Sequence, residues 1–177
     1  RVPEPDPEVY RTEIETWRAK RLNNLKAPKG WLNLAGLYWL HNGLNTFGSD
    51  TANDIVFPPK APPFIGTLAL SHDSVFLRST FVPVYIDSIP ANNLLLKDDA
   101  SVSPDMMTLG TYAWNIIRRS DRFGIRLRDF KNPMIDSLSA IPYFEISENW
   151  RIVAEFKPYP SPEKHKVQNV IGTEEEN

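Results

Sequence analysis

The sequence contains no cysteine, which excludes disulfides and thiolate metal sites and leaves packing as the source of stability. It also has no run that approaches the ~18 consecutive apolar residues of a membrane-spanning helix. The longest candidate, Trp31–Leu40, is interrupted by Asn33 and Gly36. We therefore expect a soluble chain without a transmembrane segment.

An excess of charge of either sign is also missing. The 20 lysines and arginines nearly balance the 22 aspartates and glutamates, which gives a formal net charge of −2. A near-neutral chain exerts no overall attraction on nucleic acid or anionic membranes, so neither is an expected partner. With 177 residues, 41% of them hydrophobic, the chain is long and apolar enough to bury its own core.

The sequence lacks the signatures of catalysis and of metal binding. Its three histidines are His41, His72 and His165. None is followed after three or four positions by the histidine or carboxylate of a helical metal site. Asp98, Asp99 and Asp105 lack the spacing of a calcium loop, and no nucleophile elbow, phosphate loop or dinucleotide glycine pattern occurs. The sequence thus predicts no catalytic residue, no metal ligand and no cofactor.

The chain begins with a pattern that indicates a helix over about residues 7–25. Asp6 suits the N-cap and Pro7 the first helical position. Apolar side chains recur at helical spacing and share one face: Tyr10, Ile14 and Trp17. Such a face usually belongs to a core. We therefore expect the segment 7–28, which comprises this amphipathic helix and the residues that end it, to pack on a sheet.

Beyond Gly30 the pattern changes to short, partly alternating runs separated by turn residues, and the 16 prolines suit loops and edges. The runs predicted as strands are Leu44–Phe47, Asp54–Phe57, Gly66–Leu70, Ser74–Arg78, Val82–Ile86, Asn93–Leu96, Tyr112–Arg118, Phe123–Arg128 and Trp150–Phe156. Turn signals about every 8–12 residues favour an antiparallel β-sandwich over alternating β and α units. We therefore predict a mainly β protein whose sandwich domain spans residues 29–160.

The two ends differ in composition from this domain. Residues 1–6 form a Pro-rich lead-in that begins at Arg1, which favours an exported, periplasmic protein whose signal has been removed. Residues 161–177 are polar and end in acidic residues, as expected of a tail or a linker toward a further C-terminal half.

The highest density of charge lies in the hairpin predicted over residues 118–129. Arg122, Arg126 and Arg128 share the parity of one strand face, and guanidinium groups in a row suit a carboxylate or phosphate. With Asp129 they are the candidate ligand-binding residues, and a small anionic ligand or a protein is the candidate partner. The alternative is a solvated face whose charge Asp121 and Asp129 balance.

Several motifs occur in the order known from one protein family. They are Gly30–Leu40, Gly43–Asp50, Asn53–Ile55, Arg119–Asp129, Asn132-Pro133, Ile141–Phe144 and Trp150-Arg151. Over about residues 8–160 the chain thereby resembles the bacterial and archaeal family catalogued as domain of unknown function 1684. The resemblance implies no established activity, and it implies a further β-rich half after the present sequence.

A second resemblance concerns the fold. The segments Phe47–Val56, Gly66–Leu70, Val75–Leu77 and Met107–Gly110 are similar to a forkhead-associated (FHA) β-sandwich, a domain that reads phosphothreonine. Its phosphate-reading residues are replaced by Gly48-Ser49, Pro62–Ile65 and Asp87-Ser88. The resemblance therefore implies an FHA-like sandwich and argues against phosphopeptide binding at that site.

Two hypotheses about function remain open. The first is a non-catalytic sandwich used for binding or as a scaffold, because no catalytic constellation occurs. The second is part of an enzyme or of a receptor for a small anion, with the arginine hairpin as its site and Trp31 and Trp39 available to line a pocket. We favour the first, and so expect no enzymatic activity.

Overall fold

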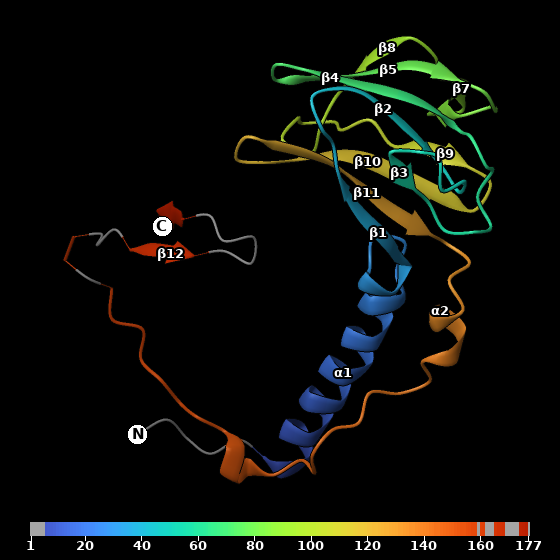
Figure 1. The fold of residues 1–177 in the computed structure, drawn as a ribbon. Coiled ribbons are helices and arrows are strands. Elements are labelled where there is room, and N and C mark those ends of the chain that lie inside the picture. Colours follow the sequence, from blue (N-terminus) through green and yellow to red (C-terminus); the bar gives the residue numbers. More distant parts are fainter. Residues whose placement is uncertain (1–5, 159, 162–164, 169–173, 177) are drawn as a thin grey trace. The chain divides into compact units, whose positions relative to one another are not determined.

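The computed structural model describes residues 6–158, 160–161, 165–168 and 174–176. They form two compact units, which we treat separately (Figure 1). The sandwich unit is Arg21–Ile141, and the terminal unit consists of the described residues within Arg1–Lys20 and Pro142–Asn177. The predicted sandwich boundaries, 29–160, stay a prediction.

The sandwich unit contains two sheets, which Figure 1 shows as stacked layers. The six-stranded sheet has the order β1 (Leu34–Trp39), β11 (Arg122–Asp129), β10 (Tyr112–Arg119), β9 (Met107–Leu109), β6 (Tyr85–Ile86) and β7 (Ile89–Pro90). The five-stranded sheet has the order β3 (Ile55–Val56), β2 (Gly43–Gly48), β4 (Gly66–Ser71), β5 (Ser74–Thr80) and β8 (Leu94–Leu96). All neighbouring strands are antiparallel except the parallel pair β2 and β3.

The core lies between the sheets because alternate residues of each strand point inward. In β4 the inward positions Gly66, Leu68 and Leu70 are buried while the residues between them are not. At the centre three aromatic rings, those of Phe47, Phe57 and Trp114, contact one another with centroids 5.6–5.9 Å apart. The prediction of a mainly β, two-sheet fold with an N-terminal helix is therefore confirmed.

Each predicted strand except Trp150–Phe156 contains an observed strand, but Val82–Ile86 is a strand only at Tyr85–Ile86 and Asp54–Phe57 only at Ile55–Val56. Other strands were not predicted. We did not predict β1 as a strand because Gly36 divides its apolar run, yet β1 tolerates the glycine at a register shift between Leu34 and Gly36. A Cβ at Gly36 would meet the ring of Tyr38, so a larger residue there would displace that ring. The short strands β7 and β9 carry too few residues for an alternating pattern.

The strand predicted over Trp150–Phe156 does not form. Its first residue ends the 3₁₀ turn η2 (Glu148–Trp150), and residues 151–158 have no regular structure. An extended segment becomes a strand only when a neighbour supplies hydrogen bonds, and no described strand pairs with these residues.

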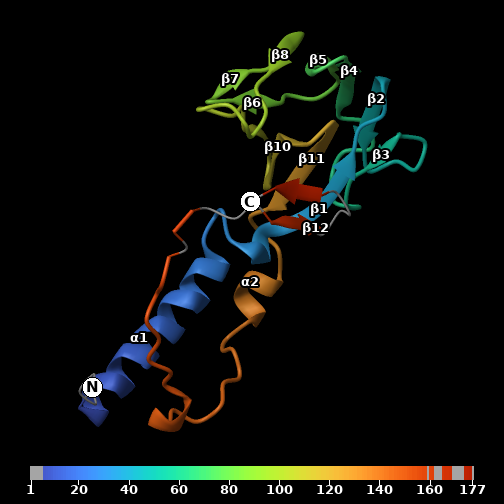
Figure 2. The same cartoon turned by 90° about the vertical axis from the view of Figure 1, so that its left-hand side faces the viewer.

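The terminal unit includes most of α1 (Pro7–Lys26). The predicted cap is confirmed, because the Glu8 amide donates to the Asp6 carboxylate at 2.8 Å. Residues Pro142–Trp150 run beside the helix from its middle toward its N-terminus (Figures 1 and 2). At the middle, Trp17 meets the edge of Tyr143 and Arg18 donates to the Phe144 carbonyl at 2.7 Å. Packing of the helix on a sheet stays a prediction.

Three shorter elements complete the described chain. They are η1 (Trp31–Asn33), α2 (Met134–Ser137) and a two-stranded ladder of β12 (Lys166–Gln168) with β13 (Glu174–Glu176). The ladder falls in the predicted polar tail, of which residues 162–164, 169–173 and 177 lie outside the described residues, as does the lead-in up to residue 5. No helix in the described ranges is long and apolar enough to cross a membrane.

The assignment of inner and outer faces predicts the result of a matched pair of substitutions. Leu77 is 0% exposed in the core, whereas Leu95 on the neighbouring β8 faces outward and is 54% exposed. We expect Leu77→Ala to lower the free energy of unfolding by about 2–5 kcal/mol, and Leu95→Ala to change it by about 0.5 kcal/mol or less. Denaturation in guanidinium chloride measures both, and equal losses would contradict the assignment.

Candidate functional site

The predicted arginine face is present on β11. Phe123, Ile125 and Leu127 point into the core and are buried, so the alternate positions face away from it. These alternate positions carry Arg122, Gly124, Arg126 and Arg128. The structure thus brings the three predicted arginines together on the outer face of the six-stranded sheet, which we call the arginine face.

Neighbouring strands determine how the arginine face is built. Trp39 of β1 is paired with Gly124, and a Cβ at that glycine would lie 2.9 Å from the tryptophan ring. The indole therefore covers the glycine, and the Arg122 guanidinium stacks on it at 4.1 Å from the ring centroid. Such a cation–π contact restricts the arginine without neutralising it.

Arg126 and Arg128 are half-buried, and their environments differ. Arg126 lies between Leu37 of β1 and Asn115 of β10. Arg128 donates from Nη1 to the Gly30 carbonyl at 2.9 Å. Burial, and then the nearby charge of Arg126, lower the pKa of Arg128 from its usual value. The two positive charges therefore affect each other.

The arginine face has no carboxylate partner in the part of the chain that the structure describes. The flanking arginines of the same hairpin do have one: Arg118 lies 3.5 Å from Asp73, and Arg119 lies 2.9 Å from Asp99. Neither Asp121 nor Asp129 forms an ion pair with the arginine face. The alternative reading, in which these two aspartates balance its charge, has no support in these contacts.

Asp129, the fourth predicted site residue, does not join this group. It continues the parity of the inward residues, is paired with Tyr112, and accepts a hydrogen bond from the Lys131 amide at 2.9 Å. Of the predicted pocket residues, Trp39 lies on the arginine face, whereas Trp31 in η1 is 75% exposed.

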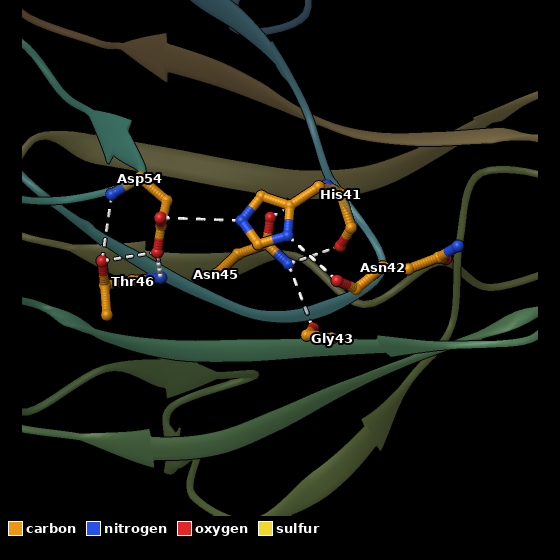
Figure 3. A network of polar contacts seen from close by, with 6 residues as sticks. All are labelled: His41, Asn42, Gly43, Asn45, Thr46 and Asp54. Carbon is orange, nitrogen blue, oxygen red and sulfur yellow. Dashed lines mark hydrogen bonds and ion pairs between the residues drawn. The ribbon is translucent and has the colours of Figure 1, made fainter.

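A second polar group, which the sequence analysis did not predict, joins His41 to Asp54 (Figure 3). His41 Nε2 lies 3.6 Å from Asp54 Oδ1, and its Nδ1 lies 3.0 Å from the Asn42 carbonyl. Asp54 also accepts from the amide and the hydroxyl of Thr46, at 2.8 and 2.9 Å. The 12 residues between the two partners hid this pair, because only the return of the chain at β3 brings them together.

The contacts of the pair favour the charged forms of His41 and Asp54 and occupy both nitrogens of the histidine ring. The Asn42 carbonyl and then Asp54 raise the pKa of His41, and the bonds from Thr46 and then His41 lower the pKa of Asp54. Both ring nitrogens face acceptors, so the histidine has no free nitrogen to act as a base. We therefore interpret the pair as a surface clip between the β1–β2 turn and β3.

Within the ranges that the structure describes, no three His, Cys, Asp or Glu residues converge in a way that could hold a metal ion. Asp99 and Asp105, whose spacing does not suit a calcium loop, accept hydrogen bonds from backbone amides. Asp99 accepts from the Arg118 amide and Asp105 from the Lys97 amide, each at 2.8 Å. Such bonds order the loop between β8 and β9.

The clip predicts a measurable change in histidine titration. Because the pKa of His41 is raised in the folded protein, its contacts stabilise the fold fully below the ordinary pKa of 6.5. This contribution is lost as pH rises through the pKa of the folded state. Because the pKa of Asp54 is lowered in the folded protein, its contacts stabilise the fold above the ordinary pKa of 3.8. This contribution is lost as pH falls through the pKa of the folded state. We expect Asp54→Asn to lower the His41 pKa in an NMR titration, with Asp73→Asn as the control that leaves it unchanged. An unaltered His41 pKa in the first variant would contradict the clip.

Comparison with known proteins adds little to this geometry. No protein-family model matches the chain, and no curated protein matches it. A solved structure described as "Structural and functional analysis of phosphothreonine-dependent FHA domain interactions" is similar to it, with 14% identity and a TM-score of 0.35 over 52% of this chain and 92% of that chain. A likeness at this level carries no argument about function, so the fold assignment depends on strand order and core.

Proposed function

We propose that this protein is a non-catalytic binding module, and that its arginine face holds an anionic group of the partner. One observation carries the proposal. Arg122, Arg126 and Arg128 lie on one strand face, and no carboxylate pairs with any of them in the described residues. Arginines whose charge no described carboxylate balances are available to pair with an anion from outside.

Arginine is chemically suited to this role. Its planar guanidinium forms paired hydrogen bonds with a carboxylate or a phosphate. Residues two apart on a strand lie about 6.6 Å from each other, so neighbouring guanidinium groups can converge on one anion or contact two adjacent ones. Partial burial strengthens the attraction, because it lowers the effective dielectric constant around Arg126 and Arg128.

The shifted titratable groups support binding over catalysis. Burial raises the pKa values of Tyr38 and Tyr112, which belong to or pack against the core. His41 and Asp54 neutralise each other in the clip. None of these four groups lies on the arginine face, so their shifted pKa values do not support catalysis there.

We also propose membership of the family catalogued as domain of unknown function 1684. The motif Gly30–Leu40 contains η1 and β1, and the motif Arg119–Asp129 contains β11. These segments, far apart in the sequence, are adjacent in the sheet because β1 pairs with β11. Two of the longest matching segments thus build neighbouring strands of one sheet, and we extend the same proposal to an FHA-like sandwich without the phosphothreonine site.

Titration with inorganic phosphate and with citrate tests the binding site. We expect the double variant Arg122→Gln/Arg126→Gln to bind at least about tenfold more weakly, since a hydrogen bond to a charged group contributes about 1.5–3 kcal/mol. Isothermal titration calorimetry measures the affinities, and NMR of the arginine Nε–H groups shows which arginines contact the anion.

The control is Arg78→Gln, which removes one arginine charge from an exposed position on β5 in the other sheet. It should bind like the unaltered protein. Equal binding by the double variant and this control, or no binding of either anion to the unaltered protein, would refute the proposal.

A further inference from the structure

The strand β1 is an unprotected edge of the six-stranded sheet. In the described part of the chain it pairs with β11 and with no other strand, which leaves a row of backbone N–H and C=O groups without strand partners. Proteins usually blunt such edges with lysine, proline or bulges. β1 has the sequence Leu-Ala-Gly-Leu-Tyr-Trp, without charge or proline, and is regular from Gly36 to Trp39.

The arginine face lies directly beside this edge. Arg126 is paired with Leu37, which is 51% exposed, and Arg122 is stacked on Trp39. A strand added outside β1 would lie two strand spacings, about 9.6 Å, from β11. Long arginine side chains of β11 and long acidic side chains of the added strand can therefore meet above β1.

We infer that the free edge of β1 binds an extended acidic segment of a partner protein by strand addition. This inference rests on the proposed function, because it names the partner of the arginine face. Backbone hydrogen bonds to β1 supply affinity, and side chains at alternate positions supply specificity. The arginine face selects acidic residues at every second position of the partner.

The other face of the added strand has a different requirement. It would lie beside Tyr38, whose ring stacks on Phe57 with centroids 5.6 Å apart at the margin of the core. Apolar side chains suit that position, because they would cover the half-buried ring. The preferred partner is therefore a segment in which acidic and apolar residues alternate.

Both parts of this surface favour a peptide over nucleic acid. The unpaired groups of β1 are peptide donors and acceptors in alternation, which another peptide backbone satisfies and a phosphodiester backbone does not. The indole of Trp39 is engaged by Arg122 and covers Gly124, so stacking on bases has no free platform there.

Peptides about as long as β1, with glutamate and valine alternating, test the inference against the full chain. Two further versions carry N-methyl groups on alternate backbone amides, one on each set, because only one set faces β1. We expect the unmethylated peptide to bind and one methylated version to bind at least tenfold more weakly, while the other binds normally. Fluorescence anisotropy measures affinity, and hydrogen exchange should show protection of the β1 amides.

The charge requirement is tested separately. A peptide with glutamine for glutamate, and the Arg122→Gln/Arg126→Gln protein with the glutamate peptide, should each lose at least tenfold in affinity, whereas Arg78→Gln should lose nothing. If citrate binds through the arginines but both methylated peptides bind as well as the unmethylated one, or single-stranded DNA binds more tightly than the peptide, strand addition is wrong and the proposed function stands. If neither citrate nor the peptide depends on the arginines, both are wrong.

Discussion

The alternation of side chains along β11 is the constraint on which the sandwich unit depends. β11 lies between β1 and β10, and its odd-numbered residues from Phe123 to Leu127 complete the core while the even-numbered ones carry the arginine face. A slip of one residue would exchange the two sets and place guanidinium groups among buried aromatic rings. The register of the sheet and the position of the site therefore have a single cause.

The passage of the chain from one sheet to the other depends on a small number of polar contacts. Buried Asn45 accepts from the His41 amide at 3.0 Å and donates to the carbonyls of His41 and Gly43, so its carboxamide is satisfied without water. Gly43 has a φ of +92°, which a residue with a side chain rarely adopts. The clip between His41 and Asp54 adds a charged contact on the surface of the same turn.

The edge strand β1 and the arginine face are interpreted together because neither alone indicates a binding site. An apolar edge alone would be a hazard for aggregation, and an exposed row of arginines alone would be an ordinary solvated surface. Side by side, the arginines supply an electrostatic attraction without a preferred direction, and the backbone of β1 supplies a row of directional hydrogen-bonding groups. In the same sheet Arg118 and Arg119 are neutralised by aspartates, which leaves the free charge next to β1.

The sequence by itself determined the features that local chemistry decides. The Asp6 cap, the helix that follows it, the alternating strands and the parity of the arginines depend on neighbours a few residues away. Only the tertiary structure decided that β1 pairs with β11, that Asp54 reaches His41, and that residues 151–158 stay without a partner strand among the described residues. Each of these depends on which distant segment supplies a hydrogen bond or a charge, and that choice is made by the packing of the whole core.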